Sequence, residues 1–258
     1  MPRSRLPLLL VLAVAATALG GFVVFQGFLA GDSVPQLTLP PVATATTPAA
    51  TDGTASGGPT ATAGASSASA GTVKATPAGL AGTWSIGDGS VVGYRVREQL
   101  GAVTALTDAV GRTSAITGSA TLVATSDSIS VTAASFDADV SQLTSDETRR
   151  DNRIRSIGLE SSRFPTAKFT LTSPVDVPAA ALSASTVDVS LAGDLTIHGV
   201  TKAVTIAGKA QLNGDRILIV ASLTFPFSDF GMSPPNIAGF VSVQDDATLE
   251  VLLSLAKT

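Results

Sequence analysis

Four arginines lie within seven residues of one another, close enough for their guanidinium groups to bind one anion. Arg149, Arg150 and Arg153 surround Asp151 in a polar run that ends at Arg155. Because a guanidinium presents paired N–H donors that match phosphate and carboxylate oxygens, this cluster predicts a site for an anion or a ligand headgroup. The alternative is a solvated helix face held by exposed ion pairs, each of which contributes little. The sequence leaves both interpretations open.

The single histidine is the next candidate for chemistry. His198 could serve as a general base or a pH-sensitive group. An enzyme would need partners such as Asp194 and Lys202 to converge on it, and the chain has no Gly-x-Ser-x-Gly motif for a nucleophilic serine. A histidine at the end of a strand more often bonds a nearby backbone group, so we interpret His198 as structural.

Carboxylates and cysteines give little support for a metal site. Asp137, Asp139, Asp245 and Asp246 lack the spacing of an EF-hand calcium loop, so we interpret them as strand ends and turns. The chain has no cysteine, which removes thiol nucleophiles and cysteine-ligated zinc. We therefore expect a protein that is not an enzyme and that holds no metal or cofactor.

The phenylalanines are spread over several predicted strands and the connections between them. Phe225 and Phe227 lie two residues apart, so their side chains share one face of a strand. One interpretation is that these rings form the packed core that a small barrel needs. The other is that they line an apolar tunnel for a chain-like ligand.

The N-terminal region predicts export and attachment to a membrane. Residues 6–31 contain no charge over 26 residues, which is long enough for a helix to cross a bilayer. Arg3 and Arg5 precede this segment, so the positive-inside rule places the N-terminus in the cytoplasm and the rest of the chain outside. The alternative is a cleaved signal peptide, for which Ala16-Thr17-Ala18 is a suitable cleavage site and which would leave a secreted protein.

Composition divides the chain into three parts. Residues 1–31 form the cytoplasmic stub and the transmembrane anchor. Residues 32–80 consist mainly of Thr, Ala, Gly, Ser and Pro without apolar periodicity, so we expect a disordered linker. Residues 81–258 form one domain that carries most of the charges. The net charge of −4 disfavours nucleic acid as a partner.

Alternation of polar and apolar side chains recurs along the domain. A period of two is typical of strands with one buried face. It is found in residues 128–133, 186–191, 203–208 and 248–253, and residues 216–225 form a more continuous apolar run.

Turn and helix signals complete the predicted architecture. Asn213-Gly214 predicts a hairpin turn, and Gly193-Asp194 predicts a bulge or bend within one long strand. The polar segment 144–156 predicts one short helix capped by Ser145 or Asp146. The fold class is therefore all-β, an antiparallel barrel of about eight strands with one short helix, preceded by the anchor and the linker.

Four motifs occur in the domain in a fixed order: Arg150-Asp-Asn-Arg-Ile-Arg-Ser, Phe164-Pro-Thr-Ala-Lys-Phe-Thr, Gly193-Asp-Leu-Thr-Ile-His-Gly-Val-Thr-Lys and Phe227-Ser-Asp-Phe-Gly-Met. Together they resemble the YceI-like family of lipocalin-like, polyisoprenoid-binding proteins, over about residues 82–256. The third motif is the most specific. Val110-Gly-Arg-Thr and Gly158-Leu-Glu are similar to the high-GC Gram-positive branch of that family.

The resemblance implies a lipocalin-like eight-stranded barrel whose long apolar cavity binds an isoprenoid, a quinone-like tail or another lipid, and it implies no catalytic residues. We expect such a barrel to act as a carrier or buffer at the outer face of the cell membrane. The headgroup candidates are Arg149, Arg150 and Arg153. The expected cavity-lining residues are Trp84, Tyr94, Phe136, Phe164, Phe169, Leu195, Ile197, Phe225, Phe227 and Phe230.

The alternative function is a non-enzymatic interaction module whose loops bind a protein or a cell-wall partner. This alternative predicts an exposed patch around residues 98–110 or 149–155. It also predicts a barrel interior without a cavity.

Overall fold

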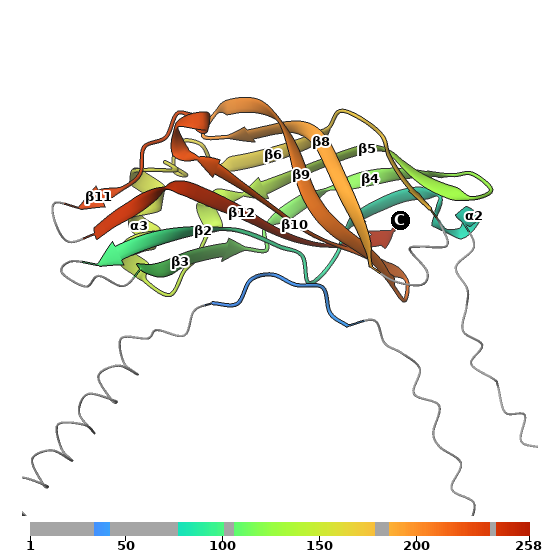
Figure 1. Cartoon of the computed structure of the whole chain (residues 1–258), viewed down its shortest axis with the longest axis horizontal. Coiled ribbons are helices and arrows are strands. Elements are labelled where there is room, and N and C mark those ends of the chain that lie inside the picture. Colours follow the sequence, from blue (N-terminus) through green and yellow to red (C-terminus); the bar gives the residue numbers. More distant parts are fainter. Residues whose placement is uncertain (1–33, 42–76, 101–105, 179–185, 238–240) are drawn as a thin grey trace, which may run out of the picture.

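The computed structural model describes one β-rich domain together with a short segment that precedes it (Figure 1). The described residues are 34–41, 77–100, 106–178, 186–237 and 241–258. The predicted anchor and most of the predicted linker lie outside these ranges. Within them, none of the helices has the length and apolar character that crossing a bilayer requires.

Eight antiparallel strands form a closed ring in the order β1-β4-β5-β6-β8-β9-β10-β12, and pairing of β12 with β1 closes it (Figure 1). The predicted eight-stranded barrel is confirmed. The bounds are β1 (Gly82–Ile86), β4 (Ile116–Ala124), β5 (Ser128–Asp139), β6 (Thr166–Leu171), β8 (Val187–Ile197), β9 (Val200–Asn213), β10 (Arg216–Pro226) and β12 (Val241–Lys257).

Two further strands extend the ring at one end. β2 (Val91–Leu100) follows β1 along the same edge of β12, which pairs with β1 through residues 255–257 and with β2 through residues 241–252. β3 (Leu106–Thr113) pairs with β2. The helix α3 (Thr148–Ser156) lies at this end of the barrel (Figure 1). The remaining elements are α2 (Pro77–Leu80), β7 (Val175–Pro178), β11 (Asn236–Ile237) and the 3-10 helices η1 (Val140–Gln142) and η2 (Phe227–Phe230).

The sequence pattern and the strands agree closely. The alternating segments lie in β5, β8, β9 and β12, and the continuous apolar run is β10. Asn213 ends β9 and Gly214 lies in the turn before β10 with a φ of 63°, which is the hairpin that the Asn-Gly pair predicts.

The bulge predicted at Gly193-Asp194 is wrong. β8 keeps one register with β9 through both residues. A Cβ at Gly193 would lie 2.4 Å from the Phe169 ring on the neighbouring strand β6. The glycine therefore makes room for an aromatic ring instead of marking a bulge in its own strand.

The predicted helix begins with a different cap. The Glu147 carboxylate accepts a hydrogen bond from the Arg149 backbone N–H at 3.1 Å, so Glu147 is the N-cap in place of Ser145 or Asp146. Ser145 instead donates to the buried Asp151 carboxylate, through its backbone N–H at 2.9 Å and its hydroxyl at 2.7 Å. These bonds tie the loop before α3 to the first turn of the helix.

Two parts of the predicted linker belong to the folded structure. α2 packs against the barrel, where Leu80 is buried and its carbonyl accepts a hydrogen bond from Trp84 Nε1 at 2.8 Å. Residues 34–41 lie against the outer wall of the barrel, where Arg95 and Gln211 donate to their backbone carbonyls. The folded unit therefore includes residues on the N-terminal side of residue 81.

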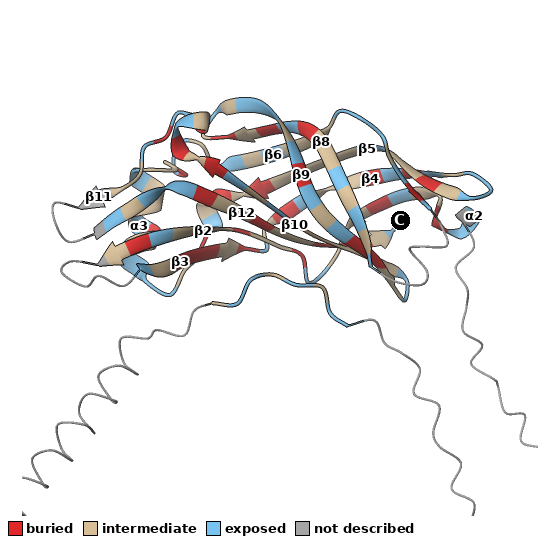
Figure 2. Ribbon diagram, viewed as in Figure 1, coloured by how far each residue is buried: buried red, intermediate tan, exposed pale blue. Residues whose placement is uncertain are grey.

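One half of the barrel interior is filled by a cluster of buried side chains. Figure 2 marks the buried residues of the strands in red. Its largest members are almost completely buried, with Trp84 2% exposed and Leu255 1% exposed. We call this region the packed half. Its buried residues are Leu80, Trp84, Ile116, Ala120, Leu122, Ile129, Ala138, Val177, Ala210, Ile217, Leu253 and Leu255.

Candidate functional site

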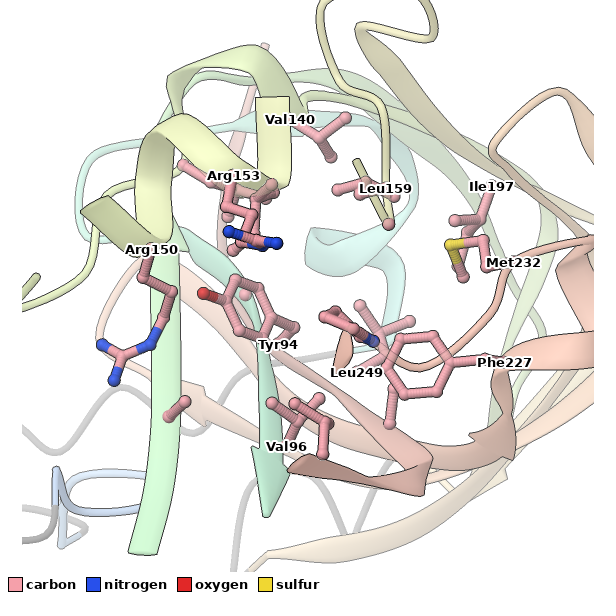
Figure 3. Close-up of a pocket in the computed structure, with 18 of the residues that line it drawn as sticks. Tyr94, Val96, Val140, Arg150, Arg153, Leu159, Ile197, Phe227, Met232 and Leu249 are labelled. Atoms are coloured by element: carbon pink, nitrogen blue, oxygen red, sulfur yellow. The ribbon is translucent and has the colours of Figure 1, made fainter. Parts of the chain in front are cut away.

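The other half of the barrel interior holds an apolar cavity of about 680 Å³ (Figure 3). We call this region the cavity half. Strands β2, β10 and β12 form one side of the wall, and α3 with residues 157–159 forms the other. A volume of this size is typical of sites for small ligands. The apolar side chains of the wall include Val92, Val96, Val140, Leu143, Ile154, Ile157, Leu159, Ile197, Phe225, Phe227, Met232, Val243 and Leu249.

Alternation along β2 and β12 produces the apolar wall. Tyr94 and Val96 line the cavity, whereas Arg95 between them faces the outer wall. Leu249 also lines the cavity, and the next residue, Glu250, forms an ion pair with Arg95 at 2.7 Å between Oε1 and Nε. The same strands therefore present an apolar surface inside and a charged surface outside.

Two features keep the cavity half open. Ala109 and Ala247 line it, whereas β12 contributes the larger Leu253 and Leu255 to the packed half. In addition, α3 has only one large apolar residue, Ile154. The helix therefore covers this end of the barrel without filling it.

A glycine on the neighbouring strand leaves room for the Tyr94 ring. Tyr94 pairs with Gly111 across β2 and β3, and a Cβ at Gly111 would lie 2.4 Å from the Tyr94 ring. The Tyr94 hydroxyl is buried, and no hydrogen-bond partner for it is found among the described residues. Burial raises the pKa of this hydroxyl well above its usual range, although the Arg150 charge acts in the opposite direction. Tyr94 is therefore a neutral donor at physiological pH.

Arg150 is already paired. It donates to the Glu98 carboxylate of β2 at 2.6 Å, forms an ion pair with Asp146, and has a side chain that is 19% exposed. Burial acts to lower the pKa of Arg150, but the hydrogen bond and the charge of Glu98 outweigh it, so the pKa is raised. Arg150 thus links α3 to the barrel as a charged group.

Arg153 lies next to Tyr94 on the cavity wall, and its Nε is buried without a hydrogen-bond partner among the described residues. Figure 3 shows Arg150, Arg153 and Tyr94 on one side of the cavity and Ile197, Met232 and Phe227 on the other. The cavity therefore has one polar end, where two buried donors are unused, and one apolar end.

Seven of the predicted site residues lie on the cavity wall: Tyr94, Ile197, Phe225, Phe227, Arg149, Arg150 and Arg153. Sequence reasoning did not single out Val92, Val96 and Leu249, although their alternation in β2 and β12 was a usable signal. It also missed Ile154 and Leu159, because nothing local to that segment shows that it faces a cavity.

The other predicted cavity-lining residues are not part of the wall. Trp84 belongs to the packed half, and Phe136 packs against it. Phe230 lies behind the wall, edge-to-face with Phe225 at 4.8 Å between ring centroids. Phe169 and Leu195 pack in the same buried cluster as Phe230. Phe164 lies against another ring, that of His198, at 4.5 Å.

His198 has a structural position. With Gly199 it forms the turn between β8 and β9, at φ values of 52° and 74°. Its Nδ1 lies 3.2 Å from the Phe230 carbonyl oxygen, which is the kind of backbone bond that we expected. Lys202 instead pairs with Asp229, and Asp194 is exposed. These groups do not converge on His198.

The candidate calcium carboxylates do not gather either. Asp139 caps η1 by accepting a hydrogen bond from the Ser141 backbone N–H at 3.0 Å. Asp245 and Asp246 are exposed on β12. Within the described ranges, no group of three or more histidine or acidic side chains is placed to hold a metal ion.

A family model described as the YceI-like domain matches residues 84–255. Among curated proteins, a UPF0312 protein of Pseudomonas putida strain W619 is 35% identical over 109 residues, which are 40% of this chain and 53% of that protein. A UPF0312 protein of Vibrio vulnificus strain YJ016 is 30% identical over 113 residues, which are 41% of this chain and 56% of that protein. The chain thus spans about half the length of the curated relatives it matches.

Two solved structures have a similar arrangement. One is a polyisoprenoid binding domain from Saccharophagus degradans implicated in plant cell wall breakdown, with 16% identity, a TM-score of 0.49, and coverage of 69% of this chain and 99% of that chain. The other is BcnA of Burkholderia cenocepacia, with 16% identity, a TM-score of 0.45, and coverage of 62% of this chain and 95% of that chain.

Proposed function

Because the chain belongs to the family of YceI-like domains, we propose that its barrel binds a long apolar ligand, such as an isoprenoid, a quinone-like molecule or another lipid. The observation that carries the proposal is the cavity of about 680 Å³ with apolar walls and one polar end. The interaction module that we considered as an alternative predicted no cavity, so this observation favours the binding protein.

The free energy gained by burying apolar groups in the cavity sets the expected length of the ligand. Each buried CH₂ group contributes about 0.8 kcal/mol, and association costs roughly 4–15 kcal/mol in lost freedom. A tail of about 20 carbons therefore offers roughly 16 kcal/mol, which leaves about 8 kcal/mol, or micromolar affinity, after an intermediate cost. Short apolar molecules would bind too weakly to be retained.

The polar end sets the expected headgroup. Tyr94 and Arg153 have buried donors that find no partner in the described part of the chain, and Arg149 also lines the cavity. A headgroup with hydrogen-bond acceptors, such as a carbonyl or a phosphate, would satisfy these donors. Arg150 is less available for this role because Glu98 already occupies its guanidinium.

The place of action is also part of the proposal. The uncharged segment 6–31 after Arg3 and Arg5 supports a single-pass anchor with the barrel outside the cell membrane. There the protein would act as a carrier or buffer for a membrane lipid. We also propose that the chain belongs to the high-GC Gram-positive branch of the family, on the basis of the motifs that begin at Val110 and Gly158.

Native mass spectrometry of the full chain, purified gently from its own membrane, tests the binding function. We expect an additional mass of lipid size that is released on denaturation. In the variant Ala109→Phe the added ring occupies the cavity and should remove this mass, whereas Ala133→Phe on the exposed face of β5 should retain it. A clean apo mass with no uptake of added prenyl lipids or quinones would overturn the proposal.

A further inference from the structure

Residues 34–41, which we call the strap, lie on the outer wall of the barrel (Figure 1). Arg95 Nη2 donates to the Val34 carbonyl at 2.8 Å, and Arg112 Nη2 donates to the Pro35 carbonyl at 2.5 Å. At the other end, Gln211 Nε2 donates to the Pro40 carbonyl at 2.9 Å. Three side chains of the barrel thus donate hydrogen bonds to backbone carbonyls of the strap.

The strap crosses the strands instead of joining the sheet. Its hydrogen-bond donors come from β2 and β3 at one end and from β9 at the other, in a sheet ordered β3-β2-β12-β10-β9. From β2 to β9 three inter-strand spacings cover about 14 Å, and the six residue steps from Val34 to Pro40 rise about 19 Å in polyproline II, so an extended chain is long enough for this span. Pro35, Pro40 and Pro41 have no N–H and could not add a strand to the ladder.

Apolar side chains of the strap face the wall. Val34, Leu37 and Leu39 are half-buried, whereas the strap residues between and beyond them are exposed. Leu37 borders a hollow of about 310 Å³ with Val220 and Ser222 of β10. The strap therefore has an inner face that contacts the barrel and an outer face that contacts water.

The wall beneath the strap is unusual for the outside of a barrel. Arg95, Gln211 and Glu250 face outward by strand alternation, yet they are only 8%, 1% and 4% exposed. Arg95 and Glu250 are paired at 2.7 Å, and Arg112 adds a second bond to Glu250 at 3.0 Å. Asp108 also pairs with Arg95 at 2.9 Å, so two arginines meet two carboxylates, and this neutralisation makes it possible to cover the charges.

We propose that this outer wall is a peptide-binding groove that recognises an extended, proline-containing segment through its backbone carbonyls, and that the strap is its occupant. Docking of the strap converts a long tether into a short, fixed attachment. If residues 6–31 cross the membrane, only residues 32 and 33 separate the span from the docked strap. The barrel would then face the bilayer with the wall that contains β9, β10 and β12, whatever the cavity holds.

Cross-linking in the full chain in its membrane tests the groove, because the chain has no cysteine of its own. The pair Leu37→Cys and Ser222→Cys places two thiols at the hollow. The control pair Leu37→Cys and Thr132→Cys uses an exposed position on β5, which lies four strands from β10 in either direction around the ring. With a short bis-maleimide, docking should make the first pair react at least about tenfold faster. Equal rates would overturn the groove.

A matched pair of strap variants separates docking from simple proximity. In the Leu37→Cys and Ser222→Cys background, Leu39→Asp places a charge on the inner face of the strap and should reduce the cross-linking rate to that of the control pair. Thr38→Asp adds the same charge at an exposed position and should leave the rate unchanged. Equal effects of the two substitutions would overturn the assignment of the inner face.

Energy transfer to an acceptor lipid tests the orientation. Donors attached to Thr224→Cys on β10 and to Thr132→Cys on β5 report two opposite walls of the ring. We expect stronger transfer from position 224, and we expect Leu39→Asp to abolish the difference. Equal transfer from the two positions in the otherwise unchanged chain would overturn the fixed attachment. The groove and the ligand cavity are tested separately, by cross-linking and by native mass spectrometry.

Discussion

The packed half and the cavity half share the long strands β10 and β12 but differ in what fills them. β12 contributes Leu253 and Leu255 to the packed half and Ala247 and Leu249 to the cavity half. At the packed end the ring closes through β1, whose Trp84 is buried in the core. At the other end β2 and β3 continue the wall, and a polar helix covers it.

This difference separates stability from binding within one barrel. Closely packed side chains gain dispersion energy and exclude water, whereas the lining of a cavity lacks such contacts on one side. The packed half should therefore carry most of the free energy of folding. The cavity half leaves apolar surface available for contact with a ligand.

The largest expected effect compares two leucines on β12. Leu255→Ala removes a side chain that is 1% exposed in the packed half, and we expect the free energy of unfolding to fall by about 3–5 kcal/mol. Leu249→Ala on the half-buried cavity wall should lower it by only about 1 kcal/mol, because fewer contacts are lost. Urea denaturation of the full chain measures both. Equal losses would show that the two halves are not energetically distinct.

Insertion of a large ring repeats the comparison by addition instead of removal, with a smaller expected effect. Ala120→Phe overpacks the packed half next to Trp84, its partner across β1 and β4, and should destabilise by about 1–3 kcal/mol. Ala109→Phe projects into the cavity and should change stability by less than about 1 kcal/mol while it blocks the ligand. Thermal unfolding of the two variants distinguishes them. A strongly destabilised Ala109→Phe would mean that the cavity has no spare volume.

Removal of one hydroxyl should affect stability and binding in opposite directions. Tyr94→Phe keeps the ring against Gly111 but deletes a buried donor for which the described residues offer no partner, so stability should stay constant or rise by about 1 kcal/mol. If the hydroxyl donates to the headgroup, affinity should fall about fivefold to tenfold, as for one lost hydrogen bond. Displacement of a fluorescent prenyl probe measures this loss. A lower stability without ligand would contradict the unpaired hydroxyl.

The smallest effect is an optical one at high pH. Tyr94 is the only tyrosine, so the phenolate absorbance reports the cavity half alone. Because burial raises the pKa of Tyr94 above its ordinary value of 10.0, the folded chain should keep the phenol protonated at a pH where the unfolded chain has lost the proton. Stability linked to this group should be constant below pH 10 and decrease above it, because only the unfolded chain releases the proton. Phenolate formation near pH 10 in the folded chain would contradict the burial.

Sequence reasoning could predict the barrel because alternation and the Asn213-Gly214 turn are local signals. It could only partly predict the cavity. Trp84 and Tyr94 are both aromatic residues on early strands, but strand register places one against Ala120 and the other beside a cavity. The strap was not predictable, because it is held through its backbone carbonyls. Every sequence has such carbonyls, so they leave no signal in the residue types.

The extension of the wall by β2 and β3 has a further consequence for behaviour at high concentration. Within the described ranges, β3 pairs with β2 on one side, and its other side makes only a single bridge, between Arg112 and Thr144. A strand edge of this kind is where a second molecule can add its own strand and begin aggregation. β3 is eight residues long and carries Asp108 and Arg112, both held in ion pairs. These charges disfavour pairing of β3 with a strand of a second molecule. The two strands that extend the wall beside the cavity therefore also protect the protein against self-association.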